Sequence, residues 1–444
     1  MVKVITYGTY DMLHYGHIRL LKRAKALGDY LIVGVTSDDY DKKRGKINLQ
    51  QSLTERIAAV QETGLADMII VEEYEGQKID DIKRYGVDIF TVGSDWRGKF
   101  DYLKEYCDVV YLERTAGISS SELRTDDRKV KIGFIGDSEG NILNKYCSEC
   151  KYVNGAEIGG ICTSNSDVRR MHSDAEIFDN YKDLLKACDA VYVLSNPLSH
   201  YEQIKMALEA GKHVLAELPI ATNSKHFKEL SVIAKENNVV LMPAMKTAYT
   251  TAYNRLLLLL KGGAIGQVVS VDATCTSMAN TDPNAWNSIC AWGPTAILPV
   301  LQILGTDCKN YVISSLYGNR EQYYDYFSKI DFYYDSAVAS IKVGRGVKSE
   351  GSLVISGTKG YVYVPAPWWK TDYFEIRFEN AADNRRYFYQ LEGEGIRYII
   401  VAFLRAIKDG KYDTYISDNV SDKICEIIGK YYDGNTNSLN REET

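Results

Sequence analysis

Residues 8–25, GTYDMLHYGHIRLLKRAK, join an apolar segment to a stretch of helical periodicity and place two histidines at the junction. KVITYG, residues 3–8, predicts a buried strand, and IRLLKRAKALG, residues 18–28, predicts an amphipathic helix. His14 and His17 are three positions apart, so their side chains can point to one side of the turn. The chain has only six histidines, and two in one turn favour a functional role over an incidental one.

The alternation of strand and helix continues to about residue 128. We expect further strands over residues 30–36, 66–73, 87–95 and 107–115, with helices over 53–64 and 78–86. Such alternation predicts a parallel sheet covered on both faces, whose ligands bind beyond the carboxyl ends of the strands. Polar loops follow four of the predicted strands, so their side chains should meet at one edge: GTYDMLHYGH (8–17), SDDYDKKRGK (37–46), GSDW (93–96) and RTAGISSSELR (114–124).

The remaining chain predicts two further parts. A second alternating series starts at KIGFIG, residues 131–136, and predicts another Rossmann-like domain. Beyond residue 245, successive strand-like segments predict an α+β domain with a mainly antiparallel sheet. We therefore expect an α/β protein of three domains, at 1–128, 129–245 and 246–435, with a frayed polar tail over 433–444.

Composition narrows the class of protein. The 444 residues include 53 Lys and Arg against 59 Asp and Glu, and a net charge of −6 argues against a nucleic-acid surface. The apolar run LLLLL, 256–260, is too short to cross a bilayer, and MVKVITYG at the N-terminus is typical of a strand, not of a signal peptide. We expect a cytoplasmic protein without membrane insertion. The nine cysteines show no disulfide framework, and CSEC (147–150) lacks the second pair of a zinc site, so no metal site is predicted.

Residues 2–124, with their H-x-G-H and R-T-x-G-I-S motifs, resemble the cytidylyltransferase branch of the nucleotidyltransferases, especially the glycerol-3-phosphate cytidylyltransferases. The resemblance implies that CTP and a small phosphorylated alcohol give a CDP-alcohol and pyrophosphate. Mg²⁺ is expected with CTP, because it bridges the phosphates of a bound triphosphate. Related cytidylyltransferases are dimers, so we expect a homo-oligomer.

The resemblance also implies the site residues. His14 and His17 would contact the triphosphate and stabilise the transition state, while Lys46 and Arg114 would bind phosphate. The other predicted binding residues are Gly8, Thr9, Tyr10, Asp11, Asp38, Arg56, Asp95, Trp96, Thr115, Gly117, Ile118, Ser119 and Ser120.

Three of these predictions have plainer alternatives. Lys46 fits a solvated charge run, Arg56 an exposed helix face, and Asp95–Trp96 a turn with a packing indole. One position departs from the family: Gly64 stands where these enzymes carry an arginine associated with acceptor handling. The acceptor is therefore left open between glycerol 3-phosphate, ethanolamine phosphate, ribitol phosphate and another small polyol phosphate.

Residues 130–430 resemble the Gfo/Idh/MocA oxidoreductases, which implies an NAD(P) site and hydride transfer to a sugar-like ring. The residues that carry this chemistry are replaced: Ser138 stands in place of a glycine, Asp137 and Glu139 add negative charge, and Thr163, Leu218, Thr295 and Leu298 replace the acid, lysine, histidine and aspartate. We therefore expect a non-catalytic module, and NAD(P) binding stays open. Two alternatives remain: a bifunctional cytidylyltransferase and oxidoreductase, and a non-enzymatic assembly protein that binds CDP-alcohols.

Overall fold

The structure is a computed structural model of the chain. It describes residues 1–43, 49, 51–74, 76–113, 129–136, 142–153, 155–278, 286–319, 324–389, 391, 393–410 and 415–439. The chain divides into two compact units, Met1–Arg128 and Lys129–Thr444, which we call unit 1 and unit 2. The predicted boundary near residue 245 lies inside unit 2 and stays a prediction.

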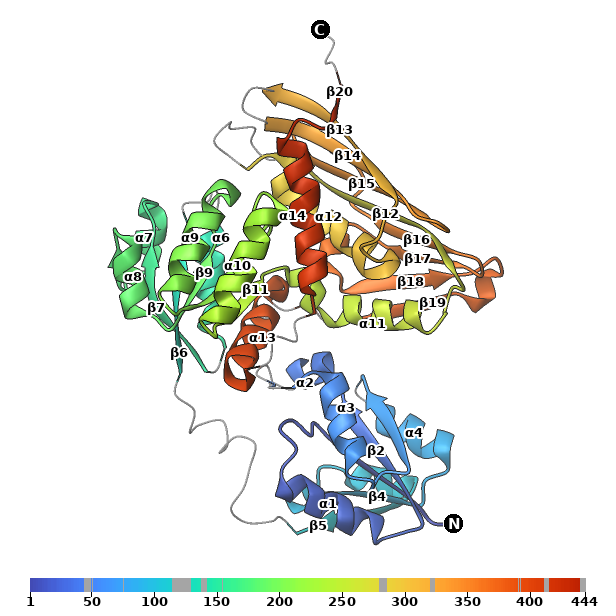
Figure 1. The fold of residues 1–444 in the computed structure, drawn as a ribbon. Helices are drawn as coiled ribbons and strands as arrows, with labels where there is room; N and C mark the ends of the chain where they lie inside the picture. The colour runs from blue at the N-terminus through green and yellow to red at the C-terminus, as the bar shows by residue number, and fades with distance from the viewer. Residues whose placement is uncertain are drawn as a thin grey trace. The chain divides into compact units, whose positions relative to one another are not determined.

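Unit 1 forms, within its described residues, a five-stranded sheet of order β3-β2-β1-β4-β5, in which every pairing is parallel (Figure 1). Its elements are β1 Lys3–Gly8, α1 Tyr15–Lys25, β2 Tyr30–Thr36, α2 Asp38–Lys43, α3 Leu53–Glu62, β3 Met68–Glu72, α4 Gln77–Tyr85, β4 Ile89–Gly93, η1 Ser94–Trp96, η2 Asp101–Glu105 and β5 Asp108–Leu112.

Both faces of this sheet are buried. On one face, Val4 and Val33 pack against Leu21 of α1 and Val60 of α3. On the other face, Ile5 and Phe90 belong to a second cluster that includes residues of α4 and η2. The strands are therefore apolar on both sides, as the continuous apolar runs predict. The order of strands reverses between β1 and β4, and a parallel sheet opens a crevice at such a point, beyond the strand ends.

Unit 2 begins with a second parallel sheet, which has the order β11-β10-β9-β6-β7-β8 in the part of the chain that the structure describes. Its elements are β6 Val130–Ile135, α6 Ile142–Cys150, β7 Ala156–Cys162, α7 Ser166–Met171, β8 Ile177–Phe178, α8 Tyr181–Ala187, β9 Ala190–Val193, α9 Pro197–Glu209, β10 His213–Ala216, α10 Ser224–Glu236 and β11 Leu241–Pro243.

A large mixed sheet follows, of order β19-β18-β17-β16-β12-β15-β14-β13-β20 over the described residues. Only the β12–β15 and β13–β20 pairings are parallel among those that the structure describes. The elements are η3 Lys246–Tyr249, α11 Thr251–Lys261, β12 Val268–Ser277, α12 Ser288–Leu304, β13 Asn310–Asn319, β14 Tyr324–Tyr333, β15 Val338–Arg345, β16 Leu353–Gly357, β17 Tyr361–Val364, η4 Trp368–Lys370, β18 Tyr373–Arg377, η5 Ala381–Asp383, β19 Arg385–Phe388, η6 Gly393–Gly395, α13 Ile396–Asp409, α14 Asp418–Tyr432 and β20 Asn437–Leu439.

The predicted fold class is confirmed: an α/β unit is followed by a second parallel sheet and a mainly antiparallel one. Helix α12 lies against β12, β14 and β15 of the large sheet, and α14 packs on α12 and α10 (Figure 1). The sequence analysis did not anticipate α14. It was also wrong to treat the whole tail as frayed, because Ser438 pairs with Ser315 and β20 extends the sheet edge.

Three expectations about unusual features can be compared with the structure. Cys147 and Cys150 are buried on α6 and face the core of unit 2. Among the described residues, no group of three or more metal-binding side chains comes together. In the same part of the chain, no helix combines the length and the apolar character that crossing a membrane requires.

Candidate active site

The loop after β1 turns back on itself at Tyr10, whose ring lies against Gly8. Tyr10 has a φ of 54°, which turns its buried ring back over the end of the strand. A Cβ atom on Gly8 would lie 2.9 Å from Cζ of that ring, so a larger residue would displace it. The glycine therefore permits the close turn that carries the chain from β1 into α1.

The two histidines cap helix α1. His14 is the N-cap residue, and its Nδ1 accepts a hydrogen bond from the Gly16 amide at 3.1 Å. Nδ1 of His17 accepts from the His14 amide at 3.5 Å, and the two rings stack with centroids 3.9 Å apart. A neutral imidazole that accepts at Nδ1 carries its proton on Nε2. The cap thus assigns both rings to the tautomer in which Nε2 is the donor, at the positive end of a helix dipole.

The pKa of His14 lies below its usual value because burial disfavours the charged ring. The folded protein therefore binds this proton less readily than the unfolded chain. As the pH falls through about 6.5, the unfolded state gains protons first and stability is lost.

We expect the thermal unfolding midpoint of unit 1 to decrease when the pH is lowered from about 7.5 to about 5.5. The decrease should be smaller in His14→Asn. Asparagine keeps the N-cap hydrogen bond but does not titrate. Calorimetry of the full chain at both pH values measures the difference, and an equal fall in both proteins would contradict the assignment.

Arg56, one of the predicted binding residues, is fully buried. Its guanidinium donates to the carbonyl oxygens of Thr9 at 2.6 Å and Thr36 at 2.9 Å. It also forms an ion pair with Asp38, and its Nε donates to the Gln51 carbonyl at 3.2 Å. These bonds use four of the five N–H donors of an arginine. The plainer alternative of an exposed helix face is wrong, and Arg56 ties the β1 loop, the end of β2 and α3 together.

Two residues that the sequence analysis passed over complete this framework. Asp41 of α2 is fully buried and accepts from the Thr9 hydroxyl at 2.9 Å and from the Thr36 hydroxyl. The backbone N–H of Gln51 donates a hydrogen bond to the buried Asp11 carboxylate at 2.9 Å, and the Gln51 side-chain oxygen accepts one from the Met12 backbone N–H at 2.8 Å. Neither residue belongs to a recognisable motif, so no sequence signal distinguishes them from ordinary polar residues.

Asp95 and Trp96 lie in η1, directly after β4 and beside the β1 loop in strand order. Asp95 is exposed, whereas the Trp96 ring is half-buried and packs 5.7 Å from the ring of Phe100. Gly64 follows helix α3 with a φ of 65°, a conformation that favours glycine at a helix end. Gly64 therefore allows the left-handed backbone conformation that ends helix α3.

The structure brings Gly8, Thr9, Tyr10, Asp11, His14, His17, Asp38 and Arg56 together around the ends of β1 and β2, with Asp95 and Trp96 after the adjacent β4. The remaining predicted site residues lie outside the described residues: Lys46, Arg114, Thr115, Gly117, Ile118, Ser119 and Ser120. The ligand contacts of the whole set stay predictions.

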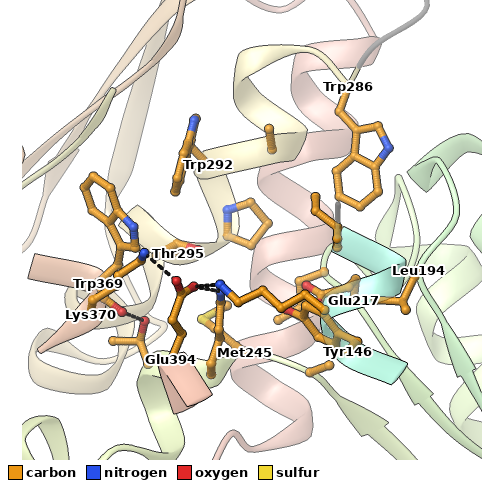
Figure 2. A pocket seen from close by; sticks show the side chains of 18 of the residues that line it. Tyr146, Leu194, Glu217, Met245, Trp286, Trp292, Thr295, Trp369, Lys370 and Glu394 are labelled. Carbon is orange, nitrogen blue, oxygen red and sulfur yellow. Dashed lines mark hydrogen bonds and ion pairs between the residues drawn. The ribbon is translucent and has the colours of Figure 1, made fainter. Parts of the chain in front are cut away.

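Unit 2 contains a cavity of about 420 Å³ (Figure 2). It lies beyond the carboxyl ends of β9, β10 and β11 and is closed by α12, β15 and η4. Glu217 lines it and accepts a hydrogen bond from the Tyr192 hydroxyl at 3.2 Å. Burial raises the pKa of Glu217. Lys246 also lines the cavity, and burial lowers the pKa of its ammonium group.

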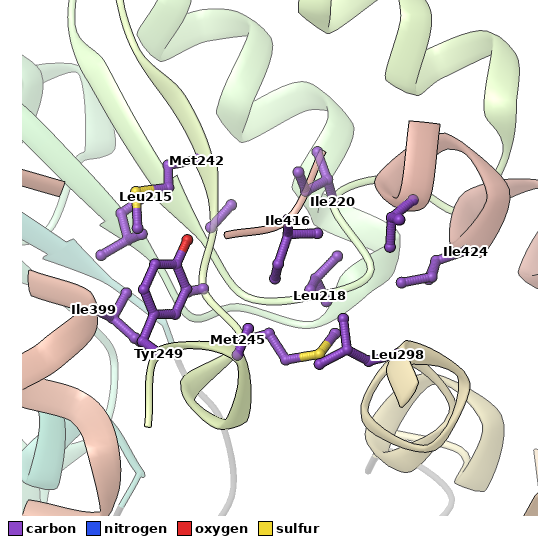
Figure 3. Packing of buried hydrophobic residues seen from close by; sticks show 14 of the residues in the cluster. Leu215, Leu218, Ile220, Met242, Met245, Tyr249, Leu298, Ile399, Ile416 and Ile424 are labelled. Carbon is purple, nitrogen blue, oxygen red and sulfur yellow. The ribbon is translucent and has the colours of Figure 1, made fainter. Parts of the chain in front are cut away.

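Two of the positions at which the oxidoreductase resemblance places catalytic groups are occupied by buried leucines. Leu218 is 5% exposed and Leu298 is fully buried, and Figure 3 shows both in one packed region with Met245. Thr295 reaches the cavity wall. Leucine side chains cannot exchange protons, so these positions supply no acid or base.

Two positions at the ends of β6 and β7 correspond to the dinucleotide-binding positions of the oxidoreductase family, and only the first keeps the expected residue type. A Cβ atom on Gly136 would lie 2.9 Å from the backbone of Leu194, so only glycine fits directly after β6. Thr163, where the family has an acid, is buried and its hydroxyl accepts from the Asn165 amide at 3.1 Å. The replaced positions 137–139 lie outside the described residues.

Fold and site together define an α/β nucleotidyltransferase unit followed by an oxidoreductase-like unit. The sequence model of the Cytidylyltransferase-like family matches residues 5–126. The glycerol-3-phosphate cytidylyltransferase of Bacillus spizizenii is 48% identical over 126 residues, which cover 28% of this chain and 97% of that protein. The chain therefore belongs to the cytidylyltransferase-like family.

The second unit has relatives of its own. The model of the oxidoreductase family with an NAD-binding Rossmann fold, Gfo/Idh/MocA, matches residues 130–245. The scyllo-inositol 2-dehydrogenase (NADP(+)) of Bacillus subtilis is 40% identical over 87 residues, 19% of this chain and 26% of that protein. KijD10, a 3-ketoreductase from Actinomadura kijaniata solved with NADP and TDP-benzene, has a TM-score of 0.63 at 18% identity, over 70% of this chain and 99% of that one. This last likeness shows the fold. The predicted fusion of two families is thus confirmed.

Proposed function

We propose that unit 1 transfers CMP from CTP to a small phosphorylated alcohol. The main support is the 48% identity to a glycerol-3-phosphate cytidylyltransferase along nearly that protein's whole length. The paired caps of α1 support it, because both place an Nε2 donor at a helix N-terminus, where phosphate binding is favoured.

In this reaction an oxygen of the acceptor phosphate attacks the α-phosphorus of CTP. The new P–O bond forms in line with the bond to pyrophosphate, which breaks. His14 and His17 donate from Nε2 to the phosphate oxygens on which negative charge develops, and neither needs to take a proton. Arg56 and Asp41 do not move protons either. They hold the Thr9 loop in place, so the donors stay positioned.

Mg²⁺ belongs to this proposal as part of the substrate. The triphosphate supplies several of its oxygen ligands, and Mg²⁺ keeps water in others, so few protein ligands are required. The exposed Asp95 carboxylate, at the end of β4, is a suitable further ligand. A homo-oligomer in the cytoplasm, where CTP is available, completes the proposal.

The test incubates the full chain with CTP, Mg²⁺ and glycerol 3-phosphate, ethanolamine phosphate or ribitol 5-phosphate, and measures pyrophosphate and the CDP-alcohol. We expect turnover with at least one acceptor and none when the acceptor is omitted. The acceptor with the highest kcat/KM identifies the alcohol. Absence of pyrophosphate with every acceptor would overturn the proposal.

A second candidate function is NAD(P)-dependent oxidoreduction by unit 2, which would make the protein bifunctional. The cavity beside Glu217 and Lys246 favours it, since these groups could serve in place of the missing lysine. The leucines at positions 218 and 298 favour a non-catalytic module instead. Titration of NADH and NADPH, followed by nucleotide fluorescence, separates the two: saturable binding supports the bifunctional alternative, and its absence at millimolar concentration removes it.

A further inference from the structure

The cavity of unit 2 is positively charged in a negatively charged protein. Among the described residues that line it, Lys145, Lys246, Arg345 and Lys370 are basic, whereas only Glu217 and Glu394 are acidic. The chain as a whole has a net charge of −6, so the overall composition does not account for this excess. A concave site with an excess of two positive side chains attracts an anionic ligand.

Glu394 forms ion pairs with the three lysines. Lys370 Nζ lies 2.9 Å from its Oε1 (Figure 2). Lys246 Nζ lies 3.5 Å from its Oε2, and Lys145 forms a further ion pair with Oε2. Burial would raise the pKa of Glu394, but the hydrogen bonds from Lys145 and Lys370 outweigh it and lower the pKa to about 2. One carboxylate thus faces three ammonium groups, and it can neutralise only one of them.

The backbone at Glu394 is strained. Glu394 has a φ of 52°, between Gly393 at 54° and Gly395 at 86°. A Cβ atom on Gly395 would lie 3.2 Å from Cβ of Lys246, so the glycine allows the turn to approach η3 closely. A non-glycine residue in this conformation costs free energy, and such positions cluster where a ligand is held. The turn presents its carboxylate to lysines that come from three different elements, α6, η3 and η4.

The cavity lining also contains indole rings and apolar side chains. The Trp292 and Trp369 rings lie 4.9 Å apart, and Leu194 and Met245 are among the apolar residues that line the cavity (Figure 2). The same cavity thus offers ammonium groups and indole rings, and together these suit a ligand with an anionic end and a carbon skeleton. A volume of about 420 Å³ suits a small molecule.

We propose that this cavity binds a phosphate monoester of a polyol or sugar, with the dianionic phosphate among Lys145, Lys246 and Lys370 and the carbon skeleton against Trp292 and Trp369. The two negative charges of the phosphate match the formal excess of two positive charges among the described residues that line the cavity. The inference goes beyond the function proposed for unit 1, because it concerns unit 2 and requires no cytidylyl transfer.

The test uses tryptophan emission of the full chain carrying Trp96→Phe. Trp96 is the one tryptophan of unit 1 among the five of the sequence, so all remaining emission comes from unit 2. Glycerol 3-phosphate and ribitol 5-phosphate are titrated, with glycerol, ribitol, inorganic phosphate and NADPH as comparisons. We expect saturable changes in emission with a phosphate ester and at least tenfold weaker binding of the unphosphorylated polyol.

Lys370→Gln, at a side chain 39% exposed, should weaken binding at least tenfold, whereas Lys370→Arg should keep it. Lys342→Gln is the matched control, because Lys342 is exposed on β15 and does not line the cavity. Circular dichroism checks that each variant is folded. Unchanged binding in Lys370→Gln, equal binding of the unphosphorylated polyol, or a response to NADPH alone would overturn the proposal. None of these readings depends on whether CTP is turned over.

Discussion

Replacing His17 with alanine is expected to lower the rate of cytidylyl transfer by about a hundredfold or more, with the fold of unit 1 intact. The reason is that His17 Nε2 is a preorganised donor. The cap of α1 already holds the ring in one tautomer, with its Nδ1 accepting from the His14 amide, so no reorganisation is needed when charge develops on the phosphate. Alanine removes the donor, but helix α1 keeps its other capping hydrogen bond, which the Gly16 amide donates to His14 Nδ1.

The measurement is pyrophosphate release under saturating CTP and acceptor, together with kcat/KM for each substrate. We expect kcat and kcat/KM to fall together, because the interaction is made in the transition state. Lys22→Ala is the matched control, since Lys22 is exposed on the same helix beyond the turn, and it should retain the wild-type rate. A His17→Ala protein with full activity would refute the role assigned to His17.

The second large effect concerns stability. Arg56→Ala should destabilise unit 1 by about 3–5 kcal/mol, because it leaves a buried carboxylate and carbonyl groups without their cation. Asp41 is fully buried, with an oxygen 3.6 Å from Arg56 Nη1, and the carbonyls of Thr9 and Thr36 accept from the same guanidinium. Lysine cannot replace the arginine, since a single ammonium cannot serve acceptors on three segments at once.

Hydrogen exchange of the full chain, followed by mass spectrometry of peptides, measures this effect unit by unit. We expect peptides of β1 and β2 to exchange faster in Arg56→Ala while peptides of unit 2 are unchanged. Arg19→Ala provides the comparison, because Arg19 is an exposed arginine of the same unit and its removal should change stability by less than about 0.5 kcal/mol. Wild-type protection of β1 in Arg56→Ala would show that the buried network is dispensable.

The sequence predicted the main architecture because it depends on local repetition. The apolar runs that became β1, β2 and β3 are continuous, and each is followed by a helical period, which suffices for a parallel sheet. The prediction failed at the tail, where the three residues of β20 are exposed and pair with the edge strand β13. For Arg56, only the alternative of an exposed helix face was wrong, since a charged residue on an amphipathic helix does not reveal which neighbours will bury it.

By itself, the sequence determined the alternation of strands and helices in the two parallel sheets, the histidine turn and the replacement of the oxidoreductase side chains at positions 218 and 298. The tertiary structure alone decided which polar groups act together. Glu394 meets lysines from α6, η3 and η4, and Arg56 meets carbonyls of two separate strand ends. The physical reason is that periodicity records which residues are buried along one element, whereas ion pairs between distant segments form only after those elements have packed.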